Sequence, residues 1–222
     1  MTQAQWTAVD NYITGLFVPP DAALDEALKA AVAAGLPAIH VAPNQGKLLS
    51  ILAQSIGAKR ILEVGTLAGY STIWLARALP PGGSLVTLEY DPKHAEVARQ
   101  NIARAGLDGV VEVRLGKAID TLPQLAAEGK EPFDFIFIDA DKPSNTDYFA
   151  WALKLSRPGS MIVVDNVVQD GAVVDPATQD ANAQGVRRFN TLAAAEPRVR
   201  MTAVQTVGSK GYDGFAIALV VG

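Results

Sequence analysis

The sequence predicts an α/β fold in which helices cover both faces of a doubly wound, mostly parallel sheet. From Arg60 onward, short apolar segments alternate with helix-length segments, as they do in strand–helix–strand units. Near the C-terminus, two apolar segments are separated only by a glycine-containing connection, which predicts an antiparallel strand pair at the edge of the sheet. The first 55 or so residues read as helical, with interruptions at Pro19-Pro20 and Pro37, and we expect an N-terminal helical cap.

The expected elements follow in chain order. Apolar segments predict parallel strands at residues 61–64, 85–88, 110–115, 133–138 and 161–164. Helices are expected between them at residues 71–79, 92–104, 118–127 and 147–155, the first of which stops before Pro80-Pro81-Gly82-Gly83. A further helix at 184–195 precedes the C-terminal strands at 199–207 and 215–221, with residues 208–214 as their hairpin connection.

Composition limits the possible classes of protein. With 222 residues, of which 49% are hydrophobic and 19% charged, the chain suits a single domain over residues 1–222, with a cap at 1–55 and a sheet core at 56–222. A net charge of −4 argues against a nucleic-acid partner, and the lack of a long apolar run argues against a membrane span. The absence of cysteine excludes disulfides, thiolate catalysis and cysteine-ligated zinc, and the start does not resemble a secretory signal. We therefore expect a cytoplasmic protein.

Polar side chains follow two neighbouring strands of the predicted sheet. Asp139-Ala140-Asp141-Lys142 ends one strand, and Asp165-Asn166 ends the next, 26 residues after Asp139. With one helix between them, these strands should be parallel neighbours roughly 4.8 Å apart. Their carboxyl ends lie at the sheet edge where ligands bind. Hard oxygen donors without nearby His or Cys favour Mg²⁺, with Mn²⁺ or Ca²⁺ as alternatives, over zinc.

A simpler interpretation must be weighed against a metal site. Single Asp and Asn residues after strands are ordinary turn and helix-cap residues. Two such clusters on neighbouring strands, one of them with an adjacent lysine, favour the ion, because exposed acidic pairs repel each other.

A glycine-containing loop follows the first strand. Gly65 and Gly69 allow a tight turn and a close approach of the backbone to a ligand, although their spacing is not the GxGxxG dinucleotide pattern. Glu89 ends the second strand 24 residues after Gly65, near the offset at which an acid binds a ribose diol. The alternative is an exposed Glu89 with Asp91 as a helix cap, and both roles are compatible.

Taken together, these motifs resemble a known family. The segment from Glu63 to Ser71, the cluster 139–142 and Asp165-Asn166 are similar to the cation-dependent, S-adenosylmethionine-dependent O-methyltransferases of the caffeoyl-CoA and catechol type, especially the bacterial members. The resemblance covers roughly residues 35–222. It implies a Rossmann-like, seven-stranded sheet whose last two strands form an antiparallel hairpin.

The resemblance also implies residues that bind the cofactor S-adenosylmethionine. One group would hold its amino-acid end, and Glu89 would hold its ribose. Ala118 would lie beside the adenine, Asp141 would make a further contact, and Val41 would contact the cofactor through its backbone. The residues of the first group are Glu63, Gly65, Thr66 and Ser71.

The implied metal ligands are Asp139, Asp165 and Asn166, and Lys142 matches the proposed general base, acting beside Asp139. The alternative for Lys142 is a solvated lysine paired with Asp141. A vicinal diol bound to the cation would lose a hydroxyl proton more easily. His40 and His94 are expected to be packed or on the surface, although His40 also has a position from which it would line the pocket.

The expected acceptor is a small catechol-like molecule. The segment 169–182 is acidic, and Gln169-Asp170 stands where plant members carry Trp-Asn, so a coenzyme A thioester is disfavoured. Family resemblance further implies a homodimer. Alternative functions are a metal-independent methyltransferase acting on another metabolite, a protein or RNA, a nicotinamide dehydrogenase, and a cofactor-binding module without activity.

Overall fold

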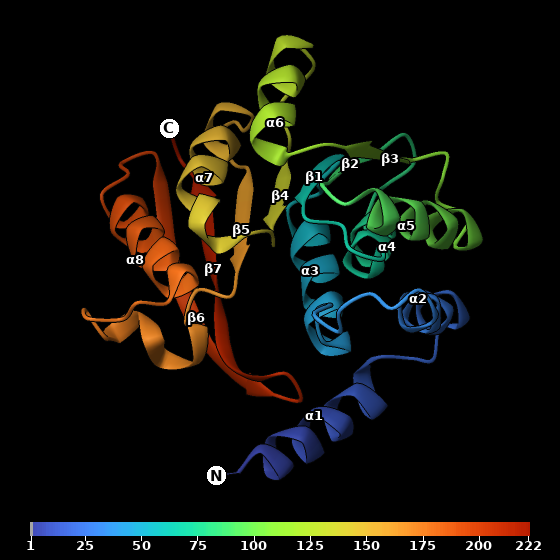
Figure 1. Ribbon diagram of the computed structural model, residues 1–222. Coiled ribbons are helices and arrows are strands. Elements are labelled where there is room, and N and C mark those ends of the chain that lie inside the picture. Colours follow the sequence, from blue (N-terminus) through green and yellow to red (C-terminus); the bar gives the residue numbers. More distant parts are fainter. Residues whose placement is uncertain (1) are drawn as a thin grey trace.

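A seven-stranded sheet forms the centre of the computed structural model, which describes residues 2–222 (Figure 1). The strand order is β3-β2-β1-β4-β5-β7-β6, with β1 to β5 parallel and β7 antiparallel to both of its neighbours. This confirms the expected fold class. The strands are β1 (Arg60–Val64), β2 (Ser84–Glu89), β3 (Val111–Leu115), β4 (Phe135–Ile138), β5 (Met161–Asp165), β6 (Val199–Gly208) and β7 (Gly211–Val220).

Helices cover both faces of the sheet (Figure 1). One face packs against α2 to α5, and the opposite face packs against α6 to α8. The helix α1 lies outside these layers and contacts α3 and β6. The helices are α1 (Gln3–Phe17), α2 (Ala22–Ala33), α3 (Pro43–Ser55), α4 (Tyr70–Ala76), α5 (Pro92–Arg104), α6 (Ala118–Ala127), α7 (Asn145–Lys154) and α8 (Ala181–Ala194), with short 3-10 helices η1 (Lys142–Ser144) and η2 (Gln169–Val174).

The central strands are apolar on both faces because each face is covered by helices. In β4, Phe135 and Phe137 point into the core on the α2–α5 side, whereas Ile136 and Ile138 point into the core on the α6–α8 side. All four side chains are fully buried. This two-sided burial fixes the register of the strands. It therefore also fixes the position along the sheet at which the polar residues after Ile138 leave the core.

Several expected boundaries differ from the structure; helix α8, for example, begins at Ala181 and not at residue 184. Helix α4 ends at Ala76 and not at residue 79, and a tighter turn in which Ala78 donates to Leu75 leads to Pro80. The connection between the last strands is much shorter than residues 208–214. Gly208 pairs with Gly211, so only Ser209 and Lys210 form the turn, and the positive φ of Gly211 (101°) suits this tight reversal.

The N-terminal cap is fixed to the sheet at both of its ends. Asp10 of α1 accepts a hydrogen bond from the Ser209 N–H at the tip of the β6–β7 hairpin (2.7 Å) and another from Asn44 Nδ2 (3.0 Å). In α3, Gly46 lies against Trp74 of α4, where an added Cβ would come within 2.4 Å of the indole. Among the described helices, none has the length and apolar character required to cross a lipid bilayer.

Candidate active site

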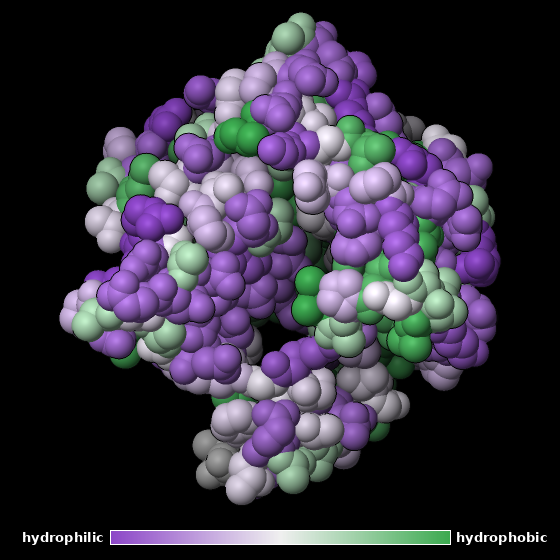
Figure 2. All heavy atoms as spheres, in the orientation of Figure 1, coloured by the Kyte–Doolittle hydropathy of each residue, from purple (hydrophilic) through white to green (hydrophobic). Residues whose placement is uncertain are grey.

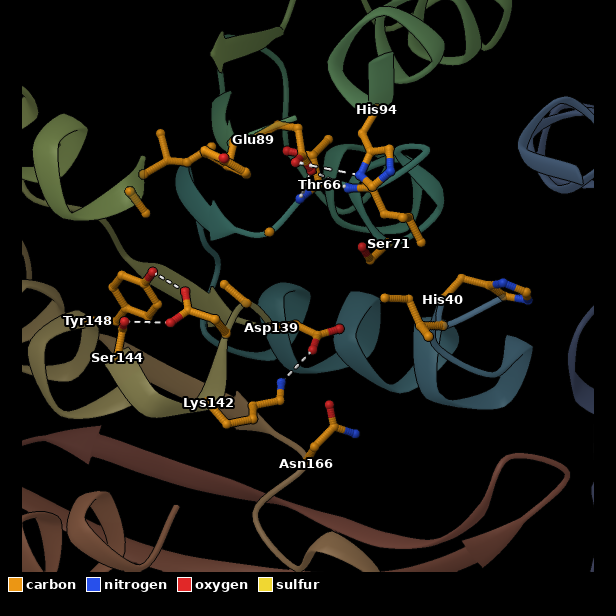
Figure 3. Close-up of a pocket in the computed structure, with 18 of the residues that line it drawn as sticks. His40, Thr66, Ser71, Glu89, His94, Asp139, Lys142, Ser144, Tyr148 and Asn166 are labelled. Carbon is orange, nitrogen blue, oxygen red and sulfur yellow. Dashed lines mark hydrogen bonds and ion pairs between the residues drawn. The ribbon is translucent and has the colours of Figure 1, made fainter. Parts of the chain in front are cut away.

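A pocket of about 810 Å³ opens at the carboxyl ends of β1, β2, β4 and β5. Figure 2 shows this face of the molecule hollowed near its centre, between the side of α7 and α8 and the side of α3 and α4. In the close-up, Asp139, Lys142 and Asn166 lie on one side of the pocket, and Thr66, Glu89 and His94 lie on the other (Figure 3). The pocket lies where ligands bind in open α/β sheets.

Gly65 brings the backbones of β1 and β4 into direct contact at the floor of this pocket. Its φ is +102°, and a Cβ at this position would lie 2.1 Å from the carbonyl oxygen of Asp139. Both the conformation and the lack of space require glycine. Gly69 follows with φ +80° as the N-cap of α4, so the loop turns sharply and presents its backbone to the pocket.

Glu63 lies below the floor of the pocket and is fully buried. Its Oε2 accepts hydrogen bonds from Thr72 and from Thr87 Oγ1 (2.7 Å), whereas Oε1 has no partner. Burial raises the pKa of Glu63 to about 7, and the nearby charge of Asp139 adds to this shift. A buried acceptor without a donor is a place where a ligand's ammonium group would be stabilised.

Glu89, at the end of β2, accepts hydrogen bonds from the backbone of the glycine-containing loop. Its Oε2 accepts from the N–H groups of Leu67 (2.8 Å) and Thr66 (3.3 Å), and its Oε1 accepts from the Asp91 N–H (2.9 Å). Asp91 caps α5 by accepting from Lys93 and His94. The structure therefore gives Asp91 the capping role and leaves Glu89 on the wall of the pocket.

The cluster after β4 divides into two hydrogen-bonded pairs. Lys142 Nζ donates to Asp139 Oδ1 at 2.8 Å (Figure 3). Asp141 accepts instead from the hydroxyls of Ser144 and Tyr148, both at 2.5 Å. Lys142 thus pairs with Asp139, and the alternative of a solvated lysine bound to Asp141 is wrong, since Lys142 is also buried.

Asp165 and Asn166 follow β5, next to this cluster. Asp165 is only 5% exposed, and its pKa is raised by burial and by the charge of Asp139. Asn166 has a positive φ (57°), a conformation that Asn tolerates, and its side chain lines the pocket beside Lys142 (Figure 3). Two nearby carboxylates and an amide oxygen form a donor set that suits a hard divalent cation, which would relieve the repulsion between the acids.

Comparison with known proteins agrees with this geometry. The profile of the O-methyltransferase family matches residues 19–218. The chain belongs to this O-methyltransferase family. The chain is 58% identical to a catechol O-methyltransferase of Niastella koreensis over 220 residues, which cover 99% of this chain and 100% of the relative.

Solved structures of O-methyltransferases have the same fold. A crystal structure of an O-methyltransferase from Bacillus cereus in complex with SAH superimposes with a TM-score of 0.97 at 58% identity, covering 99% of this chain and 100% of that one. The O-methyltransferase TomG of Streptomyces achromogenes, involved in tomaymycin synthesis and solved with SAM, gives a TM-score of 0.97 at 53% identity, with both chains fully covered.

The pocket of this O-methyltransferase is lined by nearly every residue that the sequence predicts to bind the cofactor or the cation or to act as the base. Glu63 and Asp165 are the exceptions, because both are buried and lie beneath the floor of the pocket. The residues that line it are Val41, Gly65, Thr66, Ser71, Glu89, Ala118, Asp139, Asp141, Lys142 and Asn166.

Other residues of the O-methyltransferase pocket are not evident from sequence. His94 lines the wall, with Nδ1 3.7 Å from Glu89 Oε1, and is not a simple surface residue. His40, by contrast, lines the pocket as its place in the sequence allows, and packs edge-on against Tyr70, with 5.5 Å between the ring centroids. Ser144 and Tyr148, which hold Asp141, follow the cluster 139–142 but belong to no motif themselves, so no pattern in the sequence marks them.

Proposed function

We propose that the protein is an S-adenosylmethionine- and divalent cation-dependent O-methyltransferase that methylates one hydroxyl of a catechol-like, vicinal dihydroxy aromatic molecule. The observation that carries this proposal is that one pocket combines a tight glycine loop, an oxygen-donor cluster and a buried lysine. The name of the Niastella koreensis relative and the SAM and SAH complexes of the structural neighbours support it.

The side of the pocket formed by β1 and β2 would hold the cofactor. Glu63, with its unpaired Oε1, and the backbone at Gly65 and Thr66 would receive the amino-acid end together with Ser71. Glu89 would receive the ribose, because its three backbone donors leave about one of its four acceptor sites free for a ribose hydroxyl. Val41, Ala118 and Asp141 would complete the contacts.

Asp139, Asp165 and Asn166 would hold the cation, with Mg²⁺ as the first choice and Mn²⁺ or Ca²⁺ as alternatives. When bound, such an ion lowers the pKa of a coordinated hydroxyl from the phenol value of about 10 and fixes both oxygens of the diol. A ring that carries two adjacent hydroxyls is therefore the acceptor that this donor set suits.

Lys142 would act as the general base. Its amine is held by Asp139 beside Asn166, and burial keeps it away from bulk water (Figure 3). For this role the amine would have to leave its ion pair with Asp139 and give up its proton when a cation takes that carboxylate. The neutral amine would then accept the hydroxyl proton, and the methyl group would pass from the sulfonium sulfur of S-adenosylmethionine to that oxygen. The other product is S-adenosylhomocysteine.

A homodimer is part of the same proposal. Helix α1 exposes Val9, Tyr12, Leu16 and Phe17 by 51–68%. The chain has 10,612 Å² of accessible surface, whereas a compact monomer of 23.4 kDa has about 9,700 Å². The excess of roughly 900 Å² is close to what one partner buries in a standard interface. Light scattering after size exclusion measures the mass of the particle and tests this point.

The test of the activity is methyl transfer from labelled S-adenosylmethionine to catechol, caffeate and caffeoyl-CoA, with Mg²⁺ and with EDTA. We expect product from the small diols only, abolished by EDTA and restored by excess Mg²⁺. Product that persists in EDTA would refute the role of the cation. Calorimetric binding of S-adenosylmethionine without product from any diol would refute the acceptor.

A further inference from the structure

A glutamine outside the pocket holds one of the proposed cation ligands. Gln45 Nε2 donates to Asp165 Oδ2 at 2.8 Å, across 120 residues of sequence. The other carboxylate oxygen, Oδ1, accepts from the Asn166 N–H at 2.9 Å. Each oxygen of Asp165 therefore has a donor from a different element, and the plane of the carboxylate is fixed.

Gln45 is itself held in place by its neighbours in the first turn of α3. Its N–H donates to Asn44 Oδ1 (3.0 Å), and Asn44 Nδ2 donates to Asp10. On its other side Gly46 is packed against Trp74 with no room for a Cβ. These contacts fix the backbone of Gln45, so its side chain reaches Asp165 from a defined starting point.

The chemical type of the donor matters as well. Asp139 is paired with the charged amine of Lys142, whereas both donors to Asp165 are uncharged N–H groups. A neutral amide orients a carboxylate without cancelling its charge, so the full charge stays available to a cation. A lysine or arginine at this position would instead compete with the cation for the same carboxylate.

From this geometry we infer that Gln45 is a positioning residue that sets the affinity for the divalent cation by orienting Asp165. The inference rests on the proposed function, because it assumes that Asp165 is a cation ligand. Gln45 does not line the pocket, so it contacts neither the cofactor nor the acceptor and acts only through Asp165. Loss of such an outer-shell partner typically weakens metal binding by about 10–100-fold.

The experiment is a titration of the metal-free protein with Mn²⁺, in which the free ion is followed by electron paramagnetic resonance. Gln45→Leu removes the donor at similar volume, and Gln45→Asn shortens its reach if the leucine variant does not fold. Gln54→Leu is the matched control, since Gln54 lies exposed on the same helix and bonds only to Ser50. Calorimetry with S-adenosylmethionine and the melting temperature accompany each titration.

We expect the Kd for Mn²⁺ to rise about 10-fold or more in the Gln45 variants. The Mg²⁺ concentration for half-maximal rate should rise by a similar factor, with cofactor affinity within twofold of wild type. The control should match wild type throughout. Gln45 variants that bind Mn²⁺ within twofold of wild type would overturn the positioning role alone. A wild-type protein that binds no Mn²⁺ would overturn the cation site and this inference with it.

Discussion

Lys142 and Asp139 form a partly buried ion pair, with 2.8 Å between Nζ and Oδ1, three residues apart at the end of β4. Strand β4 ends at Ile138 and η1 begins at Lys142, so the chain reverses within the pair and the lysine folds back over the strand end. The pair therefore places an amine next to the oxygen-donor cluster, where the acceptor hydroxyl is expected.

Replacement of Lys142 by alanine should reduce kcat by about 10²–10⁴-fold, the usual contribution of a general base. The affinity for S-adenosylmethionine should change less than twofold, because the amine bonds to Asp139 and not to the cofactor loop. Steady-state kinetics across pH measures the effect, with Lys154→Ala, an exposed lysine of α7, as control. Full turnover by Lys142→Ala at every pH would remove the lysine from the mechanism.

Asp165→Asn should abolish stabilisation by the cation without destabilising the metal-free protein. The substitution removes a buried negative charge that lies close to Asp139, and this charge repulsion contributes to the raised pKa of Asp165. In wild type, Mg²⁺ at 100 times its Kd should add about 2.7 kcal/mol to the free energy of unfolding. Melting temperatures with and without Mg²⁺ measure the difference. An equal rise in the variant would show that the ion binds elsewhere.

Glu63 predicts a pH dependence of stability in the cofactor-free protein. Its pKa is about 7 in the folded state, against 4.5 for an exposed Glu, so the folded state binds the proton more tightly. The contribution of Glu63 to the free energy of unfolding is complete below pH 4.5 and is lost as pH rises through 7. Above that pH it levels off, with a total loss on the order of 3 kcal/mol. Urea unfolding of wild type and Glu63→Gln from pH 5 to 8 should show a smaller slope in the variant. Parallel curves would contradict the prediction.

Gly65→Ala should destabilise the protein by about 3 kcal/mol or more, because the new Cβ would overlap the Asp139 carbonyl in addition to straining the backbone. Gly106→Ala is the control, since Gly106 also has a positive φ (+70°) but faces open space, and it should cost only about 1–2 kcal/mol. Urea unfolding gives both values. Similar losses of unfolding free energy in the two variants would mean that the overlap with the Asp139 carbonyl does not add to the cost of Gly65→Ala.

The sequence predicts the sheet and the acidic cluster well because both depend on local patterns. Apolar runs mark β4 and β5, and a single helix between them makes the strands neighbours, which brings Asp139 close to Asp165. The partners of these residues are less predictable. In sequence Lys142 is adjacent to Asp141 and three residues from Asp139, and only the fold back through η1 selects Asp139.

Contacts between distant segments determine the features of the fold and of the site that the sequence does not predict. Gln45 reaches Asp165 because α3 covers the face of the sheet on which Val163 of β5 packs, and nothing in the pattern around Gln45 marks it. The hairpin turn is shorter than expected because Tyr212 and Asp213 extend the strand despite a glycine on each side. Their polarity and the glycines are typical of a loop, but pairing with β6 overrides that local preference.

The bond between Asp10 and Ser209 joins segments 199 residues apart and has a consequence for the order of events on the ribosome. Helix α1 is made long before the hairpin tip that holds it. Strand β5, which ends in Asp165, likewise lacks its second neighbour until β7 emerges. In the nascent chain, helix α1 therefore lacks its partner until the hairpin has emerged, and the second edge of β5 stays unpaired until β7 follows.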